Sequence, residues 1–189
     1  MRKLILFEHI SLDGYAGGTK GEINWVKLDD EMFDLVKTWT DESDTALYGR
    51  VTYCIMQAYW PAAANKPNAT RHDIDHSNWY NQVEKIVVSR TMKDKIIENT
   101  RFIADDVPGE ITKLKSKPGK NIILFGSPGL GHFLIENKLV DELWLMLNPV
   151  ILGKGIPLFP GITHAINLKL LESIIFQVGV IGLHYSVAP

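Results

Sequence analysis

A glycine-rich segment after an apolar run is the part of this sequence that most directly suggests ligand chemistry. The run Asn121–Phe125 is typical of a buried strand, and it is followed by Gly126-Ser127-Pro128-Gly129-Leu130-Gly131 at the start of a helical stretch. Glycines allow a backbone to approach a ligand closely, and a helix N-terminus offers unpaired N–H groups to a phosphate. The spacing is not that of the dinucleotide fingerprint Gly-x-Gly-x-x-Gly. A tight strand-to-helix turn would give the same pattern.

Two other predicted strands end in residues of related chemistry. Thr45–Tyr48 leads into Gly49-Arg50-Val51-Thr52, and Lys85–Val88 leads into Ser89-Arg90-Thr91. In an open parallel sheet, ligands bind beyond the carboxyl ends of the strands. A guanidinium group there suits a phosphate monoester. Each site alone is explained as well by capping and surface charge, but the three together predict a site for a phosphorylated dinucleotide.

The hydrophobic pattern alternates between strands and helices, which predicts an α/β domain with a mainly parallel central sheet. Two extended runs, 168–177 and 180–187, predict a C-terminal antiparallel hairpin. We expect a single domain over residues 1–189, with 61–81 as a polar inserted loop. The remaining expected strands are 4–10, 45–48, 85–88, 101–104, 121–125 and 142–147, and the expected helices are 29–40, 107–114, one that begins at 49 and one that ends near 137.

Composition narrows the classes of function. With 189 residues and 46% hydrophobic content, the chain can form a full core. A net charge of −2 without a basic run makes nucleic acid an unexpected partner. No apolar run is long enough to span a membrane or to serve as a signal peptide. The single Cys54 excludes an internal disulfide and a cysteine-rich zinc site, and no metal site is expected. We expect a soluble cytoplasmic protein.

Four segments, in chain order, resemble motifs of the dihydrofolate-reductase-like superfamily. They are Thr45–Tyr53, Ile86–Thr91, Ile123–Leu130 and Pro149–Phe159. Within that superfamily, Ser11-Leu12-Asp13-Gly14 with Asn24-Trp25 is similar to the reductase domain of the riboflavin-pathway deaminase-reductase and to its stand-alone relatives. The resemblance extends over nearly the whole chain apart from 61–81.

The resemblance implies a dihydrofolate-reductase-like three-layer fold and NADPH as hydride donor. It implies that the first motif holds the adenosine-side phosphates and that the second lines the adenosine and its 2′-phosphate. The glycine loop would contact the pyrophosphate, and the nicotinamide would lie near the end of the first strand. The residues assigned to the cofactor in this way are Ile10, Ser11, Gly49, Arg50, Thr52, Ser89, Arg90, Gly126, Ser127, Gly129 and Leu130.

Two carboxylates are candidate catalytic residues. Asp13 follows the first strand near the expected nicotinamide position, and Asp34 lies near the position of the helical acid of dihydrofolate reductases, where an exposed helix carboxylate is the alternative. His9 could face the nicotinamide or be a satisfied interior histidine. Tyr15 stands where the riboflavin-pathway reductase has a basic residue after Ser-Leu-Asp-Gly. The zinc deaminase site of that enzyme cannot be built from one cysteine.

The expected function is therefore NADPH-dependent reduction of a small heterocyclic substrate. The closest activity is that of 5-amino-6-(5-phosphoribosylamino)uracil reductase in riboflavin biosynthesis. Dihydrofolate reduction, with Asp34 as the acid, is the second interpretation. An NADP-binding module without catalysis, its substrate pocket filled by 61–81, is the third. We also expect a homodimer formed partly through the C-terminal extended segments, because exposed apolar sheet edges favour association.

Overall fold

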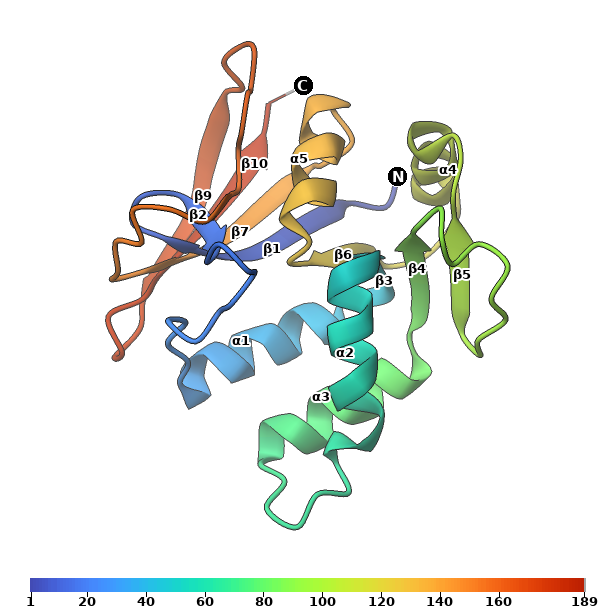
Figure 1. Ribbon diagram of the computed structural model, residues 1–189, viewed down its shortest axis with the longest axis horizontal. Coiled ribbons are helices and arrows are strands. Elements are labelled where there is room, and N and C mark those ends of the chain that lie inside the picture. Colours follow the sequence, from blue (N-terminus) through green and yellow to red (C-terminus); the bar gives the residue numbers. More distant parts are fainter. Residues whose placement is uncertain (189) are drawn as a thin grey trace. The chain divides into compact units, whose positions relative to one another are not determined.

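The computed structural model describes residues 1–188. The chain forms two compact units, a division that the sequence pattern does not mark. The first unit comprises Met1–Arg2 and Asp30–Ile123, and the second comprises Lys3–Asp29 and the chain from Leu124 onward. Figure 1 identifies the elements of each unit along the chain. None of the helices in residues 1–188 is both long and apolar enough to cross a membrane.

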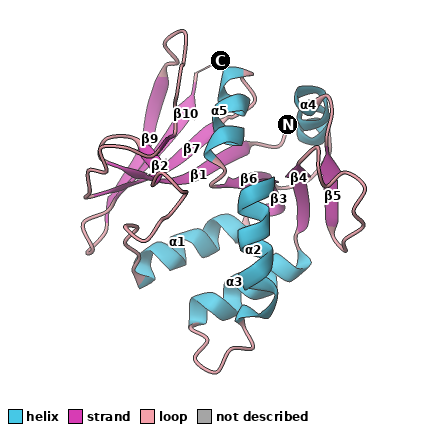
Figure 2. Ribbon diagram, viewed as in Figure 1, coloured by secondary structure: helices cyan, strands magenta, loops and turns pink. Residues whose placement is uncertain are grey.

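The first unit contains three parallel strands in the order β5-β4-β3, together with four helices. Its helix α1 buries Met32, Val36 and Trp39, a spacing that places these apolar side chains on one face. Figure 2 shows α1, α2 and α3 as a group of helices in which α3 packs on both α1 and α2. The elements are α1 (Asp30–Asp41), β3 (Ser43–Gly49), α2 (Arg50–Ala63), α3 (Arg71–Gln82), β4 (Glu84–Val88), β5 (Thr100–Ile103) and α4 (Val107–Ser116). The strand β6 (Asn121–Phe125) spans the boundary between the units.

The prediction of a loop over 61–81 is wrong, because most of this segment is helical. Helix α2 continues to Ala63, and α3 begins after Thr70. Thr70 and Asp73 form a capping box in which each side chain bonds to the backbone N–H of the other residue. The buried face of α3 consists of His76, Ser77 and Tyr80. A face of such polar composition does not give the apolar periodicity by which helices are recognised.

The second unit has the strand order β1-β7-β10-β9, in which β1 pairs parallel to β7 and the other two pairs are antiparallel. The predicted C-terminal hairpin is therefore confirmed. A small antiparallel pair, β2 with β8, was not expected from the sequence. The elements are β1 (Leu4–Ser11), β2 (Tyr15–Gly17), α5 (Pro128–Glu136), β7 (Glu142–Asn148), β8 (Ile156–Pro157), β9 (Leu168–Ile175) and β10 (Ile181–Val187).

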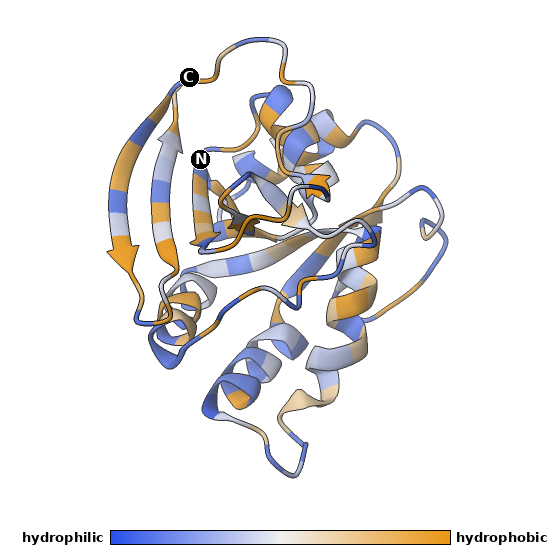
Figure 3. Ribbon diagram, turned by 60° about the vertical axis from the view of Figure 1, so that its left-hand side comes forward, coloured by the Kyte–Doolittle hydropathy of each residue, from blue (hydrophilic) through white to orange (hydrophobic). Residues whose placement is uncertain are grey.

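Strand β9 is the outermost strand of the second unit and is solvent-exposed along almost its whole length. Its exposed residues include several large apolar side chains, and Ile175 retains 79% of its accessible surface. Figure 3 shows hydrophobic segments alternating with hydrophilic ones along this strand. An apolar outer strand of this kind is a site where another chain can pair or pack.

Glu8 is an ionisable residue in the core of the second unit whose carboxyl group is not fully hydrogen-bonded. Glu8 on β1 is 6% exposed, and one of its carboxyl oxygens has no hydrogen-bond partner among the described residues. Burial raises the pKa of Glu8 from its ordinary value of 4.5 to about 8, and a hydrogen bond from the backbone of His9 lowers it only in part. Glu8 is therefore expected to be protonated in the folded protein at neutral pH.

We predict that Glu8 makes the folded state less stable as the pH rises from 4.5 to about 8. Across this window the unfolded chain has lost the Glu8 proton while the folded chain retains it, so stability falls by up to about 1.4 kcal/mol for each pH unit. Glu8→Gln should remove this pH dependence. The stability of the variant relative to the wild type should therefore increase as the pH increases. Urea denaturation from pH 5 to pH 9 measures the free energy of unfolding of both proteins.

The matched control is Glu84→Gln, which changes an exposed glutamate on β4. That variant should follow the wild-type curve throughout. If Glu8→Gln and the wild type lost stability in parallel with rising pH, Glu8 would not be the buried proton-binding group described above.

Candidate cofactor and substrate site

In the first unit, parallel pairing places two predicted phosphate-binding motifs beside each other. Gly49 at the end of β3 lies opposite Val88 at the end of β4, so that Arg50 and Ser89 follow at neighbouring strand ends. Helix α2 begins at Arg50 without a side-chain cap and without an acidic residue in its first turn. The backbone N–H groups of that turn, which include that of Thr52, can therefore donate hydrogen bonds to an anion.

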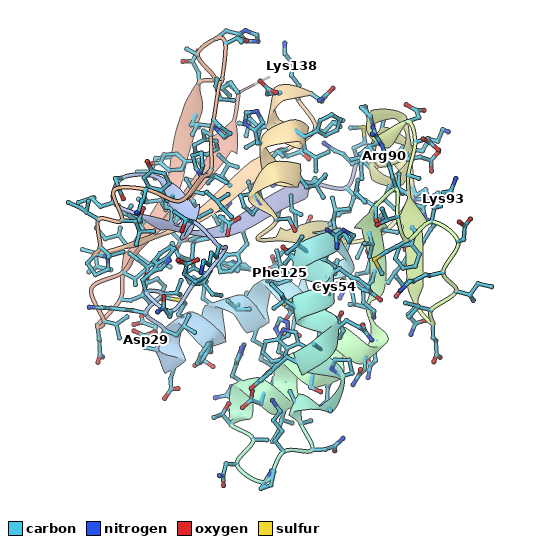
Figure 4. The ribbon with its side chains drawn as sticks, in the orientation of Figure 1. Asp29, Cys54, Arg90, Lys93, Phe125 and Lys138 are labelled. Carbon is cyan, nitrogen blue, oxygen red and sulfur yellow. The ribbon has the colours of Figure 1, made fainter. Side chains whose placement is uncertain are left out.

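The two arginines of these motifs are exposed cations. Within residues 1–188, the side chains of Arg50 and Arg90 make no hydrogen bond and no ion pair. Figure 4 shows Arg90 beyond the carboxyl end of β4. Ser89 differs from them, because it is buried and its backbone N–H donates to the carbonyl of Ile103 at 2.8 Å. Arg50 and Arg90 are thus available to a phosphate, while Ser89 stabilises the strand end.

In the second unit, the glycine loop has an unusual backbone. Gly126 and Ser127 both have positive φ angles, 53° and 61°. The left-handed conformation is unfavourable for a serine and recurs at functional sites. The Gly126 N–H donates to the Phe7 carbonyl at 2.8 Å, which fixes the loop beside β1. Ser127 is the N-cap of α5, but its side chain makes no capping hydrogen bond.

Different structural constraints explain why glycine occupies each of these positions in the loop. Gly126 permits the positive φ angle. A Cβ atom on Gly131 would lie 3.1 Å from Leu6 Cδ2, so this glycine allows α5 to pack closely on β1. A Cβ atom on Gly129 would meet nothing within 4 Å. The protein itself leaves the space at Gly129 open, as a ligand-contacting position requires, and the neighbouring Leu130 is half-buried. The backbone at Gly129 is therefore accessible from the solvent.

At the end of β1, Asp13 connects two loops of the second unit. Its carboxylate accepts a hydrogen bond from Ser11 Oγ at 2.7 Å and from the backbone N–H groups of Leu152 and Gly153 at 3.1 and 2.7 Å. The Ser11 hydroxyl, followed by these amides, lowers the pKa of Asp13. A carboxylate stabilised in its charged form in this way is a poor proton donor. These contacts show that Asp13 holds the two loops together.

Further contacts join the same two loops. The Leu12 N–H donates to Val150 at 2.8 Å, and the pairing of β2 with β8 brings Gly155 against Gly17. A Cβ atom on Gly155 would lie 2.2 Å from the Gly17 carbonyl oxygen, so only glycine fits there. The segments Ser11–Gly14 and Pro149–Phe159, both of which carry the resemblance to a known superfamily, therefore contact each other in the second unit. Ile10, also assigned to the cofactor, is buried in the core, so any contact it offers is through its backbone.

Asp34 does not have the surroundings of a buried catalytic acid. It is exposed on α1, where it lies 3.3 Å from Arg71 Nη2 of α3. Both residues line a cavity of about 300 Å³ in the first unit. The alternative of an exposed helix carboxylate therefore describes Asp34 better than the catalytic role.

His72 and His76 pack with aromatic side chains. The His72 ring stacks on Phe33 with centroids 3.9 Å apart, and His76 lies 4.0 Å from Trp60. Burial lowers the pKa of His76 to about 3. Among residues 1–188, no group of three histidine, cysteine or acidic side chains is arranged to hold a metal ion. These contacts describe the packing of α3 on α1 and α2.

Asn148 is a site residue that the sequence analysis missed. It lies opposite Ser11 in the parallel pairing of β7 with β1 and is fully buried. Its side chain bonds to the backbone of Met146 and Lys27 and lies 3.4 Å from the His9 ring. The only sequence signal for it was its place at a strand end, directly before Pro149.

Sequence comparisons identify a family and a relative that match almost the whole chain. The sequence model of the RibD C-terminal domain matches residues 2–181. The uncharacterized protein YyaP of Bacillus subtilis (strain 168) is 34% identical, over 97% of this chain and 94% of its own.

Two solved structures are similar in fold. A pyrimidine reductase-like protein from Corynebacterium diphtheriae has a TM-score of 0.70 at 15% identity, covering 100% of this chain and 92% of its own. Dihydrofolate reductase from Enterococcus faecalis, solved with NADP(H), has a TM-score of 0.64 at 16% identity, covering 99% and 97%. The chain has the expected α/β fold of dihydrofolate-reductase-like proteins, and it belongs to the RibD C-terminal domain family.

Proposed function

We propose that this protein is an NADPH-dependent reductase of a small heterocyclic substrate. The observation that most supports the proposal is the pair of unpartnered arginines, Arg50 and Arg90, beyond the ends of neighbouring parallel strands. Membership of the RibD C-terminal domain family, and a fold shared with a reductase solved with NADP(H), support the same class of reaction. NADPH would supply the hydride, and the residues of this chain would bind and orient the reactants.

Each unit, considered by itself, contains groups whose chemistry suits an anionic ligand. In the first unit, the N-terminus of α2 and the guanidinium groups of Arg50 and Arg90 suit the adenosine-side phosphates, including a 2′-phosphate. In the second unit, the open backbone at Gly129 suits the pyrophosphate, and the end of β1 suits the nicotinamide. The chemistry of these groups is that of anion binding, which fits a phosphorylated dinucleotide.

The expected substrate is a pyrimidine of the kind reduced in riboflavin biosynthesis. Dihydrofolate reduction is a weaker proposal, because Asp34 is exposed and ion-paired with Arg71. Tyr15 replaces the basic residue expected near a sugar phosphate, and its hydroxyl lies 3.5 Å from the Gly153 carbonyl oxygen. We therefore propose a substrate that resembles the riboflavin precursor but lacks a strongly bound ribosyl phosphate.

We predict weak turnover of 5-amino-6-(5-phosphoribosylamino)uracil, with greater turnover after Tyr15→Lys. A new charge-assisted contact with the ribosyl phosphate should raise kcat/KM by about tenfold, and Tyr15→Phe should not. NADPH oxidation at 340 nm, with this pyrimidine and with dihydrofolate in parallel, gives the comparison. Turnover of dihydrofolate alone would favour the second interpretation. No turnover of either compound, with NADPH still bound, would favour the binding module.

We predict that Arg50→Ala weakens NADPH binding about tenfold to a hundredfold, with little effect on NADH. A charge-assisted hydrogen bond to the 2′-phosphate is worth roughly 1.5–3 kcal/mol, and NADH lacks that group. Calorimetric titration of both cofactors measures the difference. Arg71→Ala, another exposed arginine of the first unit, is the control and should bind both cofactors normally. Equal losses for NADPH and NADH in Arg50→Ala would exclude contact with the 2′-phosphate.

We also propose that the protein is a homodimer that uses the exposed strand β9. Leu170→Lys on β9 should give the monomer mass in light scattering at micromolar concentration, because a charge would replace a half-exposed apolar contact. Ile96→Lys is the control, since Ile96 is fully exposed in the first unit. A wild-type protein that is monomeric at that concentration would contradict the proposal.

A further inference from the structure

The oxygen and nitrogen ends of the Asn148 side-chain amide cannot be exchanged without loss of its hydrogen bonds. Its Oδ1 accepts a hydrogen bond from the backbone N–H of Lys27 at 2.9 Å, and its Nδ2 donates to the carbonyl of Met146 at 2.9 Å. A backbone N–H can only donate and a carbonyl oxygen can only accept. Exchanging the two ends of the amide would therefore place donor against donor and acceptor against acceptor. These two backbone groups determine which end of Asn148 faces its neighbours.

The orientation of Asn148 in turn determines the proton position on His9. The second hydrogen of Asn148 Nδ2 faces His9 Nδ1, and the two nitrogens are 3.4 Å apart. His9 Nδ1 must accept this hydrogen bond, so the proton of the neutral ring is on Nε2. Burial lowers the pKa of His9 to about 4, so the ring is neutral at physiological pH. His9 is thus held as one tautomer with a single N–H.

That N–H group is available to a ligand. His9 is partly exposed, and within residues 1–188 its Nε2 has no hydrogen-bond partner. The ring is in edge-on contact with Phe7, with centroids 5.2 Å apart, which limits its rotation. It lies two residues before Ser11, at the end of β1 where the nicotinamide is proposed to bind. An oriented, neutral donor at this place has no evident role in the fold.

We propose that His9 determines substrate specificity by donating its Nε2–H to a carbonyl oxygen or ring nitrogen of the substrate heterocycle, with Asn148 as the positioning residue. The inference rests on the proposed reductase function and deepens it. A neutral donor suits an uncharged acceptor, such as the lactam carbonyl of a pyrimidinone or pteridinone. A site that donates a hydrogen bond to its substrate discriminates strongly against analogues without the acceptor.

The first test measures the tautomer and does not depend on enzymatic activity. Nitrogen-15 NMR of the histidine rings at pH 7 should show His9 with a protonated Nε2 and an unprotonated Nδ1. Asn148→Asp offers an acceptor in place of the donor, so it should move the proton to Nδ1. A wild-type His9 with its proton on Nδ1, or with averaged nitrogens, would overturn the role of Asn148.

The second test separates substrate recognition from cofactor binding. His9→Phe keeps an aromatic ring without the donor, and it should lower kcat/KM at least tenfold for the better of 5-amino-6-(5-phosphoribosylamino)uracil and dihydrofolate. The Kd for NADPH should stay within twofold. His9→Gln supplies an amide N–H and should recover part of the loss. His164→Phe changes an exposed loop histidine and serves as the control.

The outcomes distinguish this inference from the proposed function. Turnover by the wild type that is unchanged in His9→Phe would overturn the inference alone. A loss of NADPH affinity equal to the loss of kcat/KM would place the His9 contact on the nicotinamide and would also overturn it. No turnover by the wild type with either compound would overturn the proposed function and this inference together.

Discussion

In-register parallel pairing of neighbouring strands is the constraint on which the candidate site depends. In the first unit it places Gly49 opposite Val88, so that Arg50 and Ser89 follow side by side. In the second unit it places Ser11 opposite Asn148. Parallel strands bring their carboxyl ends to the same edge of a sheet, where loops and helix N-termini leave backbone groups unpaired. Residues that are distant in the sequence, such as Gly49 and Val88 or Ser11 and Asn148, therefore become neighbours.

Polar groups at these strand ends fall into two classes. Asp13 and Asn148 have their hydrogen bonds satisfied by backbone groups of distant segments, which fixes the loops around the proposed nicotinamide position. Arg50 and Arg90 have no partner within residues 1–188. Polar groups with satisfied hydrogen bonds make a site rigid, and unpaired exposed cations remain free to bind an anion. The separation of positioning groups from binding groups is what a preorganised site requires.

The two acidic residues proposed for catalysis illustrate why residue type and approximate position are insufficient. Hydrogen bonds, first that from Ser11, lower the pKa of Asp13, and Asp34 lies in an exposed ion pair. Glu8, which no motif marked, is the carboxyl group most altered by its surroundings. The environment of a carboxyl group depends on burial and on partners from other parts of the chain, and neither is visible in local sequence.

The sequence by itself determined the α/β class, most helices and strands, the C-terminal hairpin and the superfamily, because these follow from local periodicity and short motifs. Tertiary structure alone decided that 71–82 is a helix, since its buried face includes His76 and Ser77 and has no apolar stripe. It also decided the pairing of β2 with β8 and the contact of Asn148 with His9. These features depend on which distant backbone groups meet in the folded chain, and long-range pairing of that kind leaves no periodic signal in the sequence.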